Sequence, residues 1–139
     1  MTRASAVLGL SLVLALGSDA PASEPSAGED YVLHCSACHT PNGRGTPGLV
    51  PSLHALGPVL AHPDGRNYLV RVPGVAQAPL SDARLARLLN WVLERYSGIE
   101  ANPPYTGAEV ALLRAAPLRD PRGYRVGLEI ETGKNPPSD

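Results

Sequence analysis

This chain contains no phenylalanine and only one methionine, and aromatic residues make up 4% of its 139 residues. Large aromatic side chains usually supply much of a protein interior, so their scarcity excludes a thick core built from side chains alone. The apolar residues that are present are mostly Leu, Val and Ala. A chain of this length forms one small domain. We therefore expect a single domain with a thin core and room for a cofactor.

The sequence also lacks blocks of like charge. Its formal net charge is −1, and its 12 basic and 13 acidic residues are spread along the chain. Binding to nucleic acid or to an anionic membrane surface depends on clustered Lys and Arg. We therefore expect neither nucleic acid nor an anionic membrane surface as a partner.

No apolar run reaches the roughly 20 residues of a comfortable transmembrane helix. The apolar run at residues 6–16 follows the basic start Met1-Thr2-Arg3, and Ala20-Pro21-Ala22 offers a cleavage site. This arrangement is typical of a secretory signal peptide. We predict that residues 1–22 are a signal peptide that exports the protein to the periplasm, with an uncleaved anchor as the alternative.

Proline and glycine, by contrast, are abundant, with 15 and 14 residues, so much of the chain must be loop. The strongest helical pattern lies at 81–97, where Ser81 is a suitable N-cap and Gly98 a suitable C-terminal residue. No alternating strand pattern is present, so we predict an all-α fold. The expected organisation is a linker (23–28), a helical domain (29–97), a helical C-terminal extension (98–133) and a disordered tail (134–139). Within it, further helices are expected from about 29 through the 35–39 motif, at 64–72 and at 106–116.

The two cysteines occur together in the run Cys35-Ser36-Ala37-Cys38-His39. C-x-x-C-H is the attachment sequence of a c-type haem. Two thiols three positions apart on one helical turn can add to the two vinyl groups along one porphyrin edge, and the following histidine can bind the iron. We predict that Cys35 and Cys38 anchor one covalent haem c and that His39 is its proximal iron ligand.

Other uses of a C-x-x-C pair fit these residues less well. A redox dithiol usually follows a strand, and no apolar strand precedes Cys35. A structural zinc site needs four ligands, and His34, His54 and His62 form no second pair. A disulfide between Cys35 and Cys38 would close a very small loop and stabilise little. Redox and metal roles remain the alternatives to haem.

With its flanking residues, the motif resembles the class I mono-haem cytochrome c domains over residues 29–97. The matching features are Tyr31 before the motif, P-N-G-R-G at 41–45, V-P-S-L at 50–53 and the helical run L-S-D-A-R-L-A-R-L-L-N-W-V-L at 80–93. The resemblance implies a small helical domain wrapped around one covalently attached haem. It assigns no role to residues 98–133.

The same resemblance implies two contacts. Tyr31 should lie near Trp91 or Tyr96, where the first helix crosses the last core helix. The carbonyl of Pro51 should accept a hydrogen bond from the second ring nitrogen of His39, a bond of the kind that fixes a ligand ring.

The chain departs from the family pattern at the sixth iron ligand. Many members use a methionine before the last core helix, but Met1 is the only methionine here, and Val72-Pro73 stands at the matching position. The sixth position is therefore open under an apolar lid or is held by another side chain. The lid residues would be Val72, Val75 and Ala76, and the alternative ligands are His62, His54 and Gln77. His62 is better placed by sequence than His54.

The resemblance implies a periplasmic c-type cytochrome, an electron carrier and not an enzyme, that transfers single electrons as a monomer to and from redox partner proteins. Imidazole or water in place of methionine predicts a reduction potential below that of a His/Met relative. The alternatives are a small-gas-binding haem protein with an open distal site, a weak peroxidase, and a haem subunit of a periplasmic dehydrogenase. In the last case residues 98–133 would be the docking element.

Overall fold

The computed structural model describes residues 23–133. The expected signal peptide (1–22) and tail (134–139) lie outside these residues. Within them the chain is helical apart from loops and an isolated β-bridge between Thr46 and Val50, which confirms the all-α prediction. No helix among the described residues is both long and apolar enough to cross a membrane.

The first helix, α1 (Ala27–His34), begins inside the expected linker. The hydroxyl of Ser26 accepts from the Glu29 N–H, and the Glu29 carboxylate accepts from the Ser26 N–H at 2.7 Å, which together form a capping box. The backbone leaves helical geometry at Cys35, and a second short helix, α2 (Ser36–His39), follows. The single helix expected through the motif is therefore two short helices that meet at Cys35.

The central helix is α6 (Asp82–Val92), which Ser81 caps as expected. Its leucines at helical spacing are buried, among them Leu85 and Leu88 at 2% exposure. A π-helical turn, η2 (Leu93–Ser97), continues it to Gly98, whose φ of 62° is left-handed. These bounds confirm the helix predicted at 81–97, because its start, its apolar face and its end were all encoded locally.

The remaining helices lie on either side of α6 in the chain. They are η1 (Leu53–Ala55), α3 (Gly57–Leu60), α4 (Gly65–Arg71), α5 (Pro73–Ala76), α7 (Gly107–Arg114) and α8 (Pro121–Glu131). The helices predicted at 64–72 and 106–116 are present as α4 and α7. Pro73, which directly follows the residues of the predicted helix at 64–72, begins α5, because proline fits the first turn of a helix.

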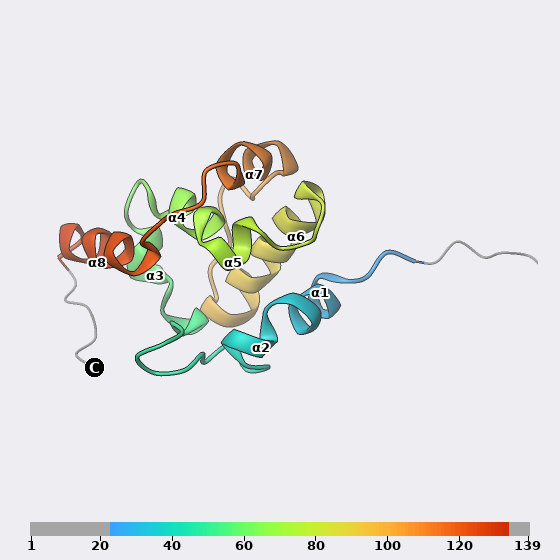
Figure 1. Cartoon of the computed structure of the whole chain (residues 1–139), viewed down its shortest axis with the longest axis horizontal. Helices are drawn as coiled ribbons and strands as arrows, with labels where there is room; N and C mark the ends of the chain where they lie inside the picture. The colour runs from blue at the N-terminus through green and yellow to red at the C-terminus, as the bar shows by residue number, and fades with distance from the viewer. Residues whose placement is uncertain (1–22, 134–139) are drawn as a thin grey trace, which may run out of the picture.

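Figure 1 shows how these helices are arranged around α6. α1 packs against α6, α7 covers α6 and α4, and α8 lies at the end of the molecule far from α1, against α3 and α4. Residues of the extension belong to the same buried core as those of α1, α4 and α6. They are Tyr105, Val110, Leu118 and Leu128. The two parts of the chain therefore share one hydrophobic core.

Candidate functional site

Residues 35–39 form one helical turn that carries both thiols. The N–H groups of Cys38 and His39 donate to the carbonyl of Cys35 at 3.2 and 2.9 Å. Both cysteines are free, Cys35 is half-buried against the core and Cys38 is exposed. Burial, with the nearby Asp30 carboxylate and Cys38, raises the pKa of the Cys35 thiol to about 11. Two reduced sulfurs are thus presented by a single turn, as thioether attachment requires.

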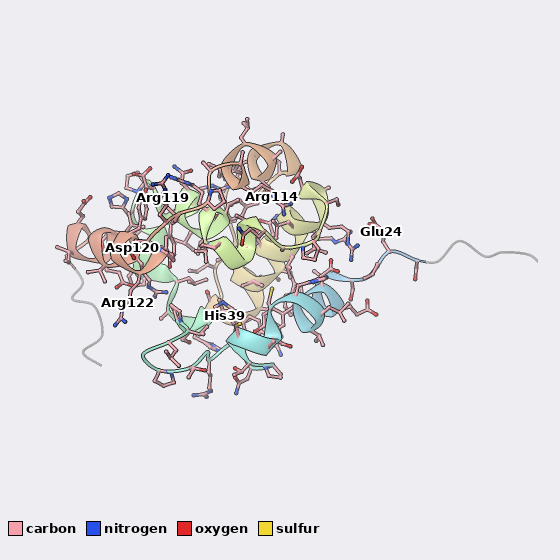
Figure 2. The ribbon with its side chains drawn as sticks, viewed as in Figure 1. Glu24, His39, Arg114, Arg119, Asp120 and Arg122 are labelled. Atoms are coloured by element: carbon pink, nitrogen blue, oxygen red, sulfur yellow. The ribbon has the colours of Figure 1, made fainter. Side chains whose placement is uncertain are left out.

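His39 ends this turn, on the side of the molecule away from α7 (Figure 2). Its Nδ1 lies 3.2 Å from the carbonyl oxygen of Pro51, so a proton on Nδ1 is donated to that oxygen and Nε2 keeps its lone pair. Burial lowers the pKa of the imidazole and the Pro51 carbonyl opposes that shift. The contact implied by the resemblance is confirmed, and a neutral ring held this way is the form in which histidine binds a metal.

A tight loop brings Pro51 to His39. The N–H of Gly45 donates to the His39 carbonyl at 2.9 Å, and Thr46 and Val50 pair their backbones beyond it. Gly45 has a φ of 68°, and a Cβ there would lie 2.2 Å from the Val50 oxygen and 2.8 Å from the Pro51 oxygen. Only glycine allows this close approach, so Gly45 is part of what places the Pro51 carbonyl.

The residue after His39 has an unusual backbone. Thr40 has φ 64° and ψ 157°, a region occupied almost only by glycine. Its carbonyl accepts a hydrogen bond of 2.6 Å from the Tyr31 hydroxyl, and its own hydroxyl lies 2.6 Å from Asn42 Oδ1. Strained backbone of this kind is common at functional sites, and here it directs the chain from the motif into the loop.

Three aromatic rings pack where α1 crosses the end of α6. The ring centroid of Tyr31 lies 5.6 Å from that of Trp91 and 4.9 Å from that of Tyr96, and Trp91 and Tyr96 are 5.7 Å apart. Tyr31 is 1% exposed. The crossing implied by the resemblance is confirmed, and it fixes α1, which leads into the motif, against the central helix.

A buried ion pair fastens the same crossing. Asp30, one residue before Tyr31, has no exposed surface, and its carboxylate accepts from Arg84 Nε at 3.3 Å and from Arg84 Nη2. Arg87 Nη2 lies 3.9 Å from it. Arg84 alternates with the buried leucines of α6 yet contacts Asp30 instead of facing only solvent, because a buried carboxylate needs a cation beside it.

The two histidines considered as sixth ligands are engaged elsewhere. His62 Nε2 lies 2.7 Å from a carboxylate oxygen of Glu131 on α8, and its Nδ1 accepts from the Asp64 N–H at 3.0 Å. His54 Nε2 lies 2.8 Å from the Asn42 carbonyl, and its ring meets the edge of Tyr96. Both ring nitrogens of His62 and one of His54 are therefore already in contacts with protein atoms.

The apolar segment between α4 and α6 belongs to the same core as the motif. Val72 and Val75 are half-buried and pack against the core that Cys35 and Leu53 also touch, and Ala76 is 5% exposed. Gln77, the weak-ligand candidate, is exposed. This segment therefore contributes apolar side chains to the core, and its one candidate iron ligand, Gln77, is exposed.

The donor groups present suit a haem better than a bare metal ion. Among residues 23–133 no group of three or more His, Cys, Asp or Glu side chains is placed to hold a metal, so a zinc site made wholly of side chains is not formed there. A porphyrin supplies its own four nitrogens and needs from the protein one axial ligand and, for a c-type haem, two thiols. Cys35, Cys38 and His39 are side chains of these types on one turn.

Sequence reasoning missed contacts between residues far apart in the chain. Neither the Asp30–Arg84 pair nor the hydrogen bonds that Arg114 makes to the segment before α6 had a local signal. No protein-family model matches this chain, and the search of curated proteins gives no match. The interpretation of the site therefore rests on its own residues and geometry.

Proposed function

We propose that this protein is a periplasmic c-type cytochrome that holds one haem through Cys35 and Cys38 and transfers single electrons between redox partner proteins. One observation carries the proposal. His39, on the same turn as two free thiols, has its Nδ1 3.2 Å from the Pro51 carbonyl oxygen. A bound haem would supply the one-electron couple of its iron.

Attachment needs no oxidant or reductant. Each thiol adds across a vinyl C=C bond, the sulfur forming a C–S bond to one carbon while the thiol hydrogen goes to the other. Both cysteines must therefore be reduced beforehand, and the free thiols of Cys35 and Cys38 meet that requirement. Half-buried Cys35 would place one thioether toward the core, and exposed Cys38 would place the other at the surface.

In the proposed site the chain's own residues would orient the His39 ring and shield the haem from water. The Pro51 carbonyl holds the His39 ring so that Nε2 keeps its lone pair and would be free to bind the iron of a haem, and a hydrogen bond of this kind raises the basicity of a ligating imidazole. Tyr31 holds the backbone just after His39 through Thr40. Val72 and Val75 would exclude water from the second haem face, since both are half-buried apolar side chains of the shared core.

A second function, binding of a small gas, is favoured by the contacts of the other histidines. His62 and His54 are occupied by Glu131 and Asn42, and the only methionine of the chain is Met1. An open sixth position would follow, and an open position is the prerequisite for a small ligand.

The decisive test of haem attachment uses the full-length precursor, expressed with export and haem-maturation machinery. The haem should remain with the wild-type chain after denaturing electrophoresis, as detected by its peroxidase-type stain. It should be lost from the Cys35→Ser/Cys38→Ser double variant and retained by Ser36→Ala, which alters the same turn but keeps both thiols. A wild-type chain without haem under these conditions contradicts the proposal.

The optical spectrum of the reduced protein, with and without carbon monoxide, separates the two functions. Low-spin absorption bands that do not change when carbon monoxide is added indicate a side chain in the sixth position and favour the electron carrier. A sharp shift of the Soret band indicates an open site and favours the gas-binding protein.

A further inference from the structure

Arg114, the last residue of α7, reaches the segment that joins α5 to α6 (Figure 2). Its Nε donates to the carbonyl of Ala76 at 2.8 Å, its Nη2 to that of Ala78 at 2.6 Å and its Nη1 to that of Leu80 at 2.9 Å. Nη1 also lies 3.0 Å from a carboxylate oxygen of Asp82. One side chain of the extension therefore binds four successive points of this segment.

These contacts supply donors to carbonyls at and beyond the end of α5, and the carbonyl of Ala78 also accepts from the Leu80 N–H at 2.8 Å. Ala76 ends α5, and the last carbonyls of a helix have no intrahelical donor. A guanidinium is favourable at that end because of its charge, and its rigid planar fork fixes several acceptors at once. The Arg114 side chain is only 18% exposed, so water competes weakly for these bonds.

The beginning of the segment is tied to the extension as well. Arg71 Nε donates to the carbonyl of Ala116 at 2.7 Å, and the N–H of Leu118 donates to the carbonyl of Arg71 at 2.8 Å. Residues 71–82 are thus fastened at both ends to residues 114–118.

The segment lies between Arg114 and the motif. In Figure 2, α5 separates the labelled Arg114 from the labelled His39, so Arg114 holds the segment from its outer side. Within the segment, Val72 and Val75 are half-buried and pack on the core against which Cys35 also packs. A change at Arg114 would therefore alter the position of these valines without removing any group near His39.

We propose that Arg114 is a positioning residue that holds residues 72–80 closed over the second haem face and thereby limits the access of small ligands to it. The inference rests on the proposed haem site and deepens it. It gives the extension a role: α7 supplies the side chain that sets how readily the cover opens.

The test compares Arg114→Gln with Arg66→Gln in the purified, haem-loaded protein. Arg66 is a matched control, because it too is a half-buried arginine that joins α7 to the rest of the molecule, with its hydrogen bonds going to Glu109 and Pro103. Two quantities are measured: hydrogen–deuterium exchange of the amides at 74–80, and the rate of carbon monoxide association with the reduced protein.

In Arg114→Gln we expect about tenfold faster exchange at 74–80, since loss of a charge-assisted hydrogen bond favours local opening. Carbon monoxide association should be several-fold faster in the same variant, and Arg66→Gln should change neither quantity. Haem-loaded variants with equal association rates overturn the inference, and so does a haem-loaded wild type that binds no carbon monoxide. A wild type without haem instead contradicts the proposed function, and the access claim falls with it.

Discussion

Tyr31 and Tyr96 pack with their ring centroids 4.9 Å apart, and their hydroxyls donate to neighbouring carbonyls of one loop. Tyr31 donates to Thr40 at 2.6 Å, and Tyr96 donates to Pro41 at 3.0 Å. These are the two carbonyls that follow His39 in the chain. The crossing of α1 with η2 and the backbone just beyond His39 are therefore held by the same pair of side chains.

Tyr31→Phe and Tyr96→Phe should each lower the free energy of unfolding by about 1–2 kcal/mol, because each removes a partly buried hydrogen bond. The Thr40 carbonyl still accepts from the Gly43 N–H at 3.1 Å after the first change. The loss of unfolding free energy in the double variant should differ from the sum of the two single losses, since the two rings are in contact and their hydroxyls bind the same loop. Urea denaturation measures the three values, with Tyr124→Phe on α8 as a control. Single variants as stable as the wild type would show that these bonds contribute nothing.

Gly45→Ala should disturb the His39–Pro51 contact, and Gly48→Ala should not. Both glycines are left-handed, with φ of 68° and 72°, but only a Cβ at Gly45 would collide with the carbonyls of Val50 and Pro51. Gly48→Ala should cost about 1–2 kcal/mol for its left-handed backbone alone, and Gly45→Ala should cost more. Denaturation gives the energies, and the imidazole signals of His39 in NMR spectra report the contact. Equal effects of the two substitutions would mean that the close approach is unimportant.

Arg84→Met should destabilise the protein more than Arg87→Met. Asp30 is fully buried, and Arg84 is its close partner, whereas Arg87 lies 3.9 Å away and also pairs with Glu24 at the surface. Removing the close cation leaves a buried carboxylate that water does not reach. Denaturation midpoints of the two variants test this, and Asp30→Asn combined with Arg84→Met should recover part of the loss. An Arg87 variant that is the less stable of the two would reverse the assignment.

Stability should decline in alkaline solution through Tyr105. Burial raises the pKa of its hydroxyl, although the Arg66 guanidinium over the ring opposes this shift and the Glu109 carboxylate adds to it. The unfolded chain releases the proton near pH 10, while the folded chain retains it. The folded state then binds more protons, so the unfolding free energy is unaffected below about pH 10 and falls above it.

Tyr105→Phe removes this titration and should make the alkaline decline less steep, even though it also loses the hydrogen bond to the Arg66 carbonyl. Burial also raises the pKa values of Tyr31 and Tyr68, so part of the decline should remain. Denaturation midpoints measured at intervals from neutral pH to about pH 11 compare the slopes. Identical alkaline slopes in the variant and the wild type would count against the shift.

The parts of the fold that could be predicted are those encoded by neighbouring residues. Ser81, the leucines of α6 and Gly98 specify where the central helix starts, what it buries and where it ends. The helical conformation of residues 36–39 was predicted from the motif, but the break at Cys35 was not. The His39–Pro51 contact came from the resemblance to cytochromes c, since no local rule brings Pro51 to that ring.

The parts that escaped prediction depend on distant partners. α8 was not predicted as a separate helix, because Gly123 and Gly127 weaken its local preference. It is stabilised instead from outside, where Tyr124 stacks on Tyr68 at 6.1 Å and Arg125 donates to the Ala55 carbonyl. The hydrogen bonds from Arg114 to residues 76–82 also join distant parts of the chain, and no local sequence pattern in either part indicates this contact.

The core shared by residues 29–97 and the extension at 98–133 has a consequence for how the protein unfolds. Val110 has no exposed surface although it lies beyond residues 29–97, and it belongs to the same buried core as side chains of α4 and α6. A chain shortened at residue 97 would expose those side chains to water. Residues 27–131 should therefore melt as one cooperative unit, and a single transition should be seen by every probe placed along it.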